Sequence, residues 1–130
     1  MISTKLFRVG LGITIAEGWH PKDVGNQGPV GSASYENHNP GNLRISEYEA
    51  GNTGGFSVFT NDIEGFMALV RQLELIATGK DTLYGDNDTI EQALATYTGL
   101  AVGSTELDDY LSTVESVGGV SRSDLVSTIA

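Results

Sequence analysis

The chain has 130 residues, of which 17 are acidic and 7 are basic, and its formal net charge at pH 7 is −10. This length fits a single domain spanning residues 1–130, and the charge argues against a nucleic-acid-binding protein or one that docks on anionic lipid. Because the chain contains no cysteine, we expect no disulfide, no thiolate metal site and no cysteine nucleophile. The two histidines lack further ligands at a metal-binding spacing, so we expect neither a metal nor a cofactor.

The N-terminal residues do not have the composition of a signal peptide. Lys5 and Arg8 interrupt the first apolar residues, and Glu17 follows before any small-residue cleavage site. No run of residues is long and apolar enough to predict a transmembrane segment. From Ser3 to about Glu17 the spacing of apolar residues instead predicts a helix, with four residues on its inner face: Leu6, Val9, Ile13 and Ala16.

A long irregular segment is expected from Gly18 to Gly55. It contains all three prolines of the chain together with many Gly, Asn and Ser residues. A segment of this kind in a small domain is usually either functional or disordered. Two short alternating runs, Asn42–Ser46 and Phe56–Thr60, are expected to pair as a β-hairpin across the turn Gly51–Gly55.

The second half of the chain predicts three helices and a last short turn. Asn61 with Glu64, and Asp88 with Glu91, have the spacing of capping boxes, and Ser104 or Thr105 begins the third helix. Glycines end these helices. The expected inward-facing residues are Ile63, Phe66, Met67, Val70, Leu73 and Ile76, then Ile90, Ala93, Leu94 and Tyr97, then Leu107, Tyr110, Leu111 and Val114. These elements predict an α+β, mainly α fold: a helical domain of four or five helices with a small β-hairpin.

Glu17 is the first candidate for chemistry. It follows the apolar run Ile13–Ala16 and precedes Trp19, so the core and an indole ring are expected to desolvate its carboxyl group. Desolvation raises a carboxyl pKa and keeps the group protonated near neutral pH, as a proton donor requires. The alternative is an exposed acid at a helix end.

The segment Asn37–Arg44 reads Asn-His-Asn-Pro-Gly-Asn-Leu-Arg and is rich in both turn residues and side-chain amides. Its residue types favour a turn that leads into a strand. The same amides are paired donors and acceptors that suit sugar hydroxyls and N-acetyl groups. Trp19 and Tyr35 stand where a sugar ring could stack, although Trp19 could instead close the core.

Four segments, in this order, resemble the lysozyme-like superfamily of phage and bacterial wall-degrading enzymes, which includes lytic transglycosylases and goose-type lysozymes. They are Ile-Ala-Glu-Gly at 15–18, Asn-Pro-Gly-Asn-Leu-Arg at 39–44, Gly-Gly-Phe-Ser-Val-Phe at 54–59 and Ala-Leu-Ala-Thr-Tyr-Thr-Gly at 93–99. The last is similar to the Ala-Leu-Ala-Ala-Tyr-Asn-Ala-Gly segment of lytic transglycosylases. The resemblance extends from residue 2 to about residue 120 and implies a lysozyme-like fold.

The resemblance also implies roles for individual residues. Glu17 falls on the catalytic glutamate that protonates the glycosidic oxygen. Tyr97 falls on the tyrosine that supports the N-acetyl group and the catalytic carboxyl. Asn39, Gly41 and Asn42 fall on the segment that lines the sugar cleft.

Two departures leave the exact reaction open. Thr98 stands where the transglycosylase motif has asparagine, and the Gly-Leu-Met-Gln element of that family is missing. Glycoside cleavage often uses a second group opposite the acid. Glu36 is the better candidate for a second carboxylate because it lies beside the Asn-rich segment, and Asp23 is the weaker one; either could be a plain loop acid. If the 2-acetamido group of the substrate takes this part, one carboxyl suffices.

The resemblance therefore implies a peptidoglycan-cleaving glycosidase that acts on the β-1,4 bond between N-acetylmuramic acid and N-acetylglucosamine. Its partner would be the glycan strands of peptidoglycan. It would be a phage-encoded monomer, either an endolysin or a virion-associated protein, that acts in the periplasm or at the cell wall. The alternative is a catalytically silent phage structural or carbohydrate-binding protein with the same fold.

Overall fold

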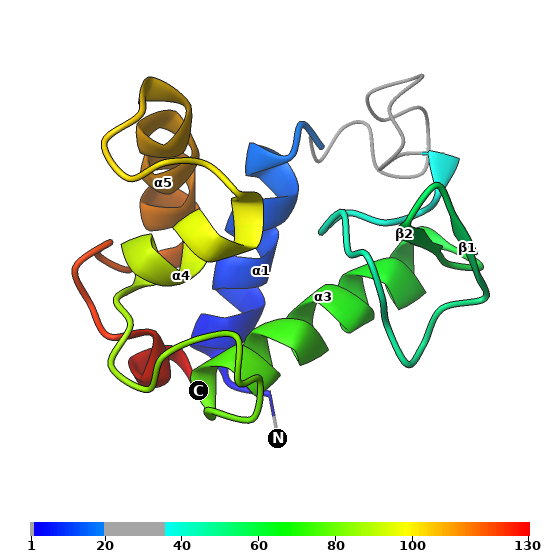
Figure 1. Ribbon diagram of the computed structural model, residues 1–130, viewed down its shortest axis with the longest axis horizontal. Coiled ribbons are helices and arrows are strands. Elements are labelled where there is room, and N and C mark those ends of the chain that lie inside the picture. Colours follow the sequence, from blue (N-terminus) through cyan, green and yellow to red (C-terminus); the bar gives the residue numbers. More distant parts are fainter. Residues whose placement is uncertain (1, 20–35) are drawn as a thin grey trace.

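The computed structural model describes residues 2–19 and 36–130 (Figure 1). The elements of these residues are α1 (Thr4–Ala16), β1 (Gly51–Thr53), β2 (Phe56–Val58), α3 (Asp62–Ala77), α4 (Ile90–Thr98), α5 (Thr105–Gly118) and the 3-10 helix η1 (Val126–Ile129). This confirms the prediction of a mainly helical α+β fold with a small antiparallel sheet. In the described part of the chain, no helix has the length and apolar character needed to cross a membrane.

Helix α1 lies at the centre of the helical part and packs against both α5 and α3 (Figure 1). The buried side chains between these helices are Leu6, Val9 and Ile13 from α1, Leu69, Leu73 and Ile76 from α3, and Leu107, Leu111 and Val114 from α5. Glycine weakens an isolated helix, but Gly12 is needed where α1 meets α5. A Cβ atom at Gly12 would lie 3.0 Å from the Cα of Val114.

The helix ends follow local signals. As predicted, the side chain of Asn61 caps α3 and that of Ser104 caps α5, each accepting from the backbone N–H three residues later. The expected capping box at Asp88 and Glu91 is wrong by one residue, because Thr89 and Gln92 form it. The carboxylate of Asp88 accepts from the N–H of Gly85 at 3.0 Å instead, and so closes the turn before α4.

The expected inner face of α3 is partly wrong. Ile63 and Met67 are 73% and 60% exposed, although both belong to the apolar stripe of the sequence. The N-terminal half of α3 buries a neighbouring face, which includes Gly65, against the loop that precedes the hairpin. A Cβ atom at Gly65 would lie 1.9 Å from the carbonyl oxygen of His38, so only glycine permits this approach.

The hairpin exists, but its first strand lies later in the chain than expected. Strand β1 pairs with β2 in a register that places Gly51 opposite Val58 and Thr53 opposite Phe56. Gly54 and Gly55 adopt φ angles of +60° and +86°, so they can form the tight turn between these strands. The expected partner, Asn42–Ser46, lies alongside β2 and accepts a bond from the N–H of Ser57 at the carbonyl of Leu43, at 2.9 Å.

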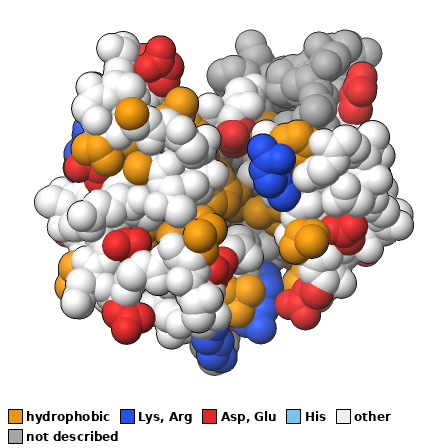
Figure 2. All heavy atoms as spheres, viewed as in Figure 1, with side chains coloured by type: hydrophobic (Ala, Val, Ile, Leu, Met, Phe, Trp, Pro, Cys, Tyr) orange, Lys and Arg blue, Asp and Glu red, His pale blue; other side chains and the backbone are white. Residues whose placement is uncertain are grey.

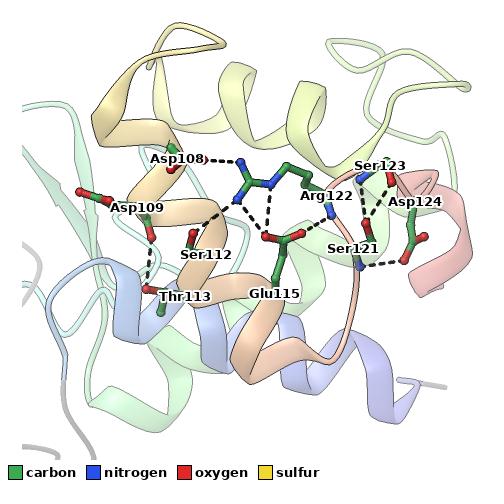
Figure 3. Close-up of polar contacts among 9 residues, drawn as sticks. All are labelled: Asp108, Asp109, Ser112, Thr113, Glu115, Ser121, Arg122, Ser123 and Asp124. Carbon is green, nitrogen blue, oxygen red and sulfur yellow. Dashed lines mark hydrogen bonds and ion pairs between the residues drawn. The ribbon is translucent and has the colours of Figure 1, made fainter.

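The C-terminal segment is fastened to α5 by Arg122 (Figure 3). Its guanidinium lies 2.6 Å from Asp108 and 2.9 Å from Glu115, and its backbone N–H donates to Glu115 at 2.9 Å. The hydrogen bonds from the side chain and the backbone of Arg122 lower the pKa of Glu115. The hydroxyl of Ser3 donates to the carbonyl of Ile129 at 2.7 Å, so the start of α1 and the end of η1 are also joined.

Candidate active site

A cleft with a volume of about 350 Å³ opens between the helical part and the hairpin part. It is lined from α1 by Ala16 and Glu17, from the loop and the hairpin by Gly41, Asn42, Arg44 and Phe56, and from α4 to α5 by Tyr97, Thr98, Leu100 and Tyr110. Figure 2 shows the hollow between these two parts, with apolar side chains in its depth and charged side chains at its rim. The cleft thus combines aromatic, amide and charged groups from five separate segments.

Glu17 occupies the C-terminal cap of α1, where its backbone N–H donates to the carbonyl of Ile13 at 2.9 Å. The position follows from the end of the apolar run, because the next residue, Gly18, has a φ of +101° and stops the helix. Burial raises the pKa of the Glu17 carboxyl to about 7. The carboxyl therefore holds its proton through mildly acidic pH and exchanges it near neutrality. The direction of this pKa shift is the one predicted from the sequence.

Tyr97 projects from α4 into the same cleft, and its hydroxyl donates a hydrogen bond to the backbone carbonyl of Gly41. Burial first, and then the negative charge of Glu17, raise the pKa of Tyr97 well above its ordinary value. The tyrosine therefore stays protonated and remains a donor. Gly41 is required at this contact, because a Cβ atom there would lie 2.8 Å from the Tyr97 hydroxyl and 2.7 Å from Cδ1 of Leu69.

Tyr110 of α5 also lines the cleft, and the sequence assigned it only to the core. Tyr110 is 9% exposed, and its hydroxyl is buried without a hydrogen-bond partner among the described residues. Burial, followed by the charge of Glu17, raises the pKa of Tyr110 well above its ordinary value. Buried hydroxyl groups in proteins usually have a hydrogen-bond partner, so this one is an exception. In the sequence, the feature that could have pointed to Tyr110 as a cleft residue is that the apolar stripe of α5 has a tyrosine at this position, where a core alone would accept a phenylalanine.

Asn39, expected to bind substrate, lies under the cleft instead of on its surface. Its side chain is 0% exposed, and its Nδ2 donates to the carbonyls of Leu43 and Ser57 at 2.8 and 3.0 Å. Its Oδ1 accepts from the N–H of Leu43 at 2.9 Å. Asn39 therefore holds the loop against β2, which positions the residues that do reach the cleft.

Asn42 and Arg44 are two of those residues. Asn42 has a φ of +51°, and its buried Oδ1 has no hydrogen-bond partner in the described part of the chain. The guanidinium carbon of Arg44 lies 4.7 Å from the centroid of the Phe56 ring. Asn42 was expected at the site. Arg44 and Phe56 belong to the segments 39–44 and 54–59 that resemble the lysozyme-like superfamily, but the sequence analysis assigned neither of them to the site.

Two other candidates, Trp19 and Glu36, are not among the described residues that line the cleft. Trp19 is 1% exposed and borders a separate apolar hollow next to Phe66, so it closes the core. Glu36 is exposed and is not one of the residues that line the cleft. Tyr35 and Asp23 lie outside the described residues.

Within residues 2–19 and 36–130, no group of three or more His, Asp or Glu side chains is arranged to hold a metal ion. No model of a known protein family matches this chain, and no curated protein or solved structure matches it either.

Proposed function

We propose that this protein is a glycosidase that cleaves the glycan strands of peptidoglycan, with Glu17 as the general acid. One observation carries the proposal: a carboxyl group with a pKa near 7, raised by burial, faces a cleft lined by aromatic and amide groups. A general acid works best when its pKa lies near the working pH. The four sequence segments that resemble the lysozyme-like superfamily supply the substrate class and the β-1,4 bond between N-acetylmuramic acid and N-acetylglucosamine.

The surroundings of Glu17 suit this reaction. Glu17 donates its proton to the glycosidic oxygen while the bond from that oxygen to the anomeric carbon breaks. The carboxylate that results then takes a proton from the incoming nucleophile, which is either water or the 6-hydroxyl of the same sugar. The side chain of Asn42 lines the same cleft, and amide groups pair well with acetamido groups and sugar hydroxyls.

Glu17 is the one carboxylate among the described residues that line the cleft. This favours a route in which the substrate's acetamido group stabilises the developing positive charge, so that one carboxyl of the protein suffices. Both products remain within the proposal. Water as the nucleophile gives a reducing end, and the 6-hydroxyl gives a 1,6-anhydro end.

The test is the clearing of a suspension of purified cell walls by the wild type, Glu17→Gln and Glu106→Gln. Glu106 is an exposed acid of α5, so its variant matches the chemical change away from the cleft. We expect the wild type and Glu106→Gln to clear walls equally, and Glu17→Gln to be slower by at least about a hundredfold. Equal clearing by Glu17→Gln would place the acid elsewhere.

The second candidate is a non-catalytic wall-binding protein, and the same samples distinguish it. Such a protein would sediment with the walls without releasing any muropeptide. If the wild type does release muropeptides, mass spectrometry of their ends separates a muramidase from a transglycosylase. Glu36→Gln in the same assay tests the expectation that Glu36 takes part, which its exposed position outside the cleft does not support.

A further inference from the structure

The basic side chains of this acidic protein are few, and three of the six described ones, Arg8, Arg71 and Arg122, already make a hydrogen bond or ion pair. Arg71 pairs with Glu74, and Arg122 pairs with both Asp108 and Glu115. Of the described basic residues, Arg44 is the one that lines the cleft. Its guanidinium forms no hydrogen bond or ion pair with another described residue.

Arg44 is nevertheless held in place. Its guanidinium carbon lies 4.7 Å from the centroid of the Phe56 ring, a cation–π contact at the start of β2. Its backbone carbonyl accepts a hydrogen bond from the side chain of Asn52 in β1 at 2.8 Å. Both ends of the residue are thus attached to the hairpin. The contact with the ring face leaves the N–H groups at the edge of the guanidinium free to donate to a ligand.

The negative net charge of the protein makes a cation at the cleft useful for binding an anionic substrate. A formal net charge of −10 repels an anionic polymer, so an anionic group of the substrate needs a cation where it enters the cleft. Glu17 lines the same cleft, and because burial raises its pKa to about 7, partial protonation near neutral pH reduces its repulsion of an anion. A guanidinium presents a planar fork of donors that matches a carboxylate in two parallel hydrogen bonds.

We infer that Arg44 binds a carboxylate of the glycan substrate, so that the cleft prefers strands carrying a carboxylate beside the cleaved bond to neutral N-acetylglucosamine polymers. This inference rests on the proposed function and adds a specificity-determining residue to it. In peptidoglycan the carboxylate has two sources. One is the lactyl group of muramic acid in strands without stem peptides, and the other is the stem peptide itself.

The experiment measures binding by isothermal titration calorimetry with the Glu17→Gln protein, so that the ligand is not cleaved. The four ligands are a peptide-free glycan tetrasaccharide, the same tetrasaccharide with its carboxyls reduced to alcohols, the tetrasaccharide with stem peptides, and the neutral N-acetylglucosamine tetrasaccharide. Each is titrated into the Glu17→Gln protein alone and combined with Arg44→Gln, Arg44→Lys or Lys80→Gln. Lys80 is an exposed cation outside the cleft, so Lys80→Gln is the matched control for charge.

We expect Arg44→Gln to weaken binding of the carboxylated ligand about tenfold to a hundredfold, because a charge-assisted pair of hydrogen bonds is lost. Arg44→Lys should retain part of the affinity, Lys80→Gln should retain all of it, and the two neutral ligands should bind equally to every variant. Dependence on Arg44 with the peptide-free strand identifies the lactyl carboxylate. Dependence only with the peptide-bearing strand identifies the stem peptide.

Two results would overturn the inference. One is that neither carboxylated strand, with or without stem peptides, binds more tightly than the carboxyl-reduced strand. The other is an equal loss on neutral ligands with Arg44→Gln. Either result leaves the proposed function standing if the wild type still clears walls in a manner that needs Glu17. Conversely, binding that depends on Arg44 in a protein that clears no walls supports the inference and refutes the catalytic proposal.

Discussion

The hydroxyl of Tyr97 donates a hydrogen bond to the backbone carbonyl of Gly41, and this contact joins α4 to the loop that precedes the hairpin. The two residues are 56 positions apart in the sequence, and both line the cleft with Glu17. One bond therefore holds two walls of the cleft together. Because burial raises the pKa of Tyr97, the bond persists through neutral and mildly alkaline pH.

Tyr97→Phe should lower the free energy of unfolding by about 1 kcal/mol and also reduce wall clearing. The change leaves the carbonyl of Gly41 without its donor, which costs more than the bond itself contributes. Urea denaturation measures the stability. Tyr48→Phe is the control, since the Tyr48 ring is exposed outside the cleft and should not change stability. An unchanged midpoint for Tyr97→Phe would contradict the prediction.

Gly41→Ala should destabilise the protein by about 2 kcal/mol, because a methyl group would collide with Leu69 and with the Tyr97 hydroxyl. Gly51→Ala is the matched control. A Cβ atom at Gly51 has no other atom within 4 Å, so this variant should unfold at the wild-type denaturant concentration. Circular dichroism during urea titration compares the two. Equal unfolding midpoints would contradict the prediction, because they would show that the loop around Gly41 moves to accommodate the methyl group.

Glu17→Gln should change how stability depends on pH. The folded-state pKa of about 7 lies above the ordinary 4.5, so the folded protein binds this proton more tightly than the unfolded chain. The contribution of this proton to wild-type stability is therefore fully present below pH 4.5 and is lost as the pH rises through 7. The variant lacks this loss, and its advantage should grow by about 3 kcal/mol between pH 4.5 and pH 8.

Thermal unfolding at several pH values measures this change, with Glu106→Gln as the control for removal of an exposed acid. A difference between Glu17→Gln and wild type that stays constant with pH would show that the Glu17 carboxyl is not desolvated. This test does not depend on any enzymatic activity.

Asn39→Ala should cost about 3 kcal/mol of stability. It leaves the carbonyl of Ser57 and the buried N–H of Leu43 without the partner that Asn39 supplies, and it removes one of the two donors to the carbonyl of Leu43. Asn87→Ala removes an exposed asparagine and serves as the control. If Asn39 contacted substrate, its loss would instead affect wall binding and leave the unfolding midpoint unchanged. Denaturant titration together with wall sedimentation distinguishes these outcomes.

Tyr110→Phe should leave stability unchanged or raise it by up to about 1 kcal/mol, since it removes a buried hydroxyl without a partner among the described residues. The same variant should clear walls at the wild-type rate, because the hydroxyl is buried and does not reach the surface of the cleft. This is the opposite stability effect to that of Tyr97→Phe, although both remove one phenol group from the same cleft. A clear loss of stability for Tyr110→Phe would mean that its hydroxyl has a partner in the folded protein.

The sequence predicted those parts of the fold that depend on near neighbours in the chain. Ser104 and Asn61 cap their helices through bonds to residues three positions away, and Gly99 and Gly119 end theirs through their own left-handed conformations. The hairpin strand was misplaced because Asn42–Ser46 and Gly51–Thr53 both lie beside β2, and local alternation does not reveal which of them forms the ladder.

For the candidate site, the sequence by itself determined that an acid would stand at the end of an apolar helix, with a tyrosine and a turn rich in asparagine elsewhere in the chain. Only the tertiary structure decided which of these groups meet. It turned Asn39 inward and Arg44 toward the cleft, left Glu36 outside the cleft lining, and placed Tyr110 beside Tyr97 as a cleft residue. The physical reason is that burial, and with it the pKa of Glu17, is a sum over neighbours from distant segments, which no local pattern contains.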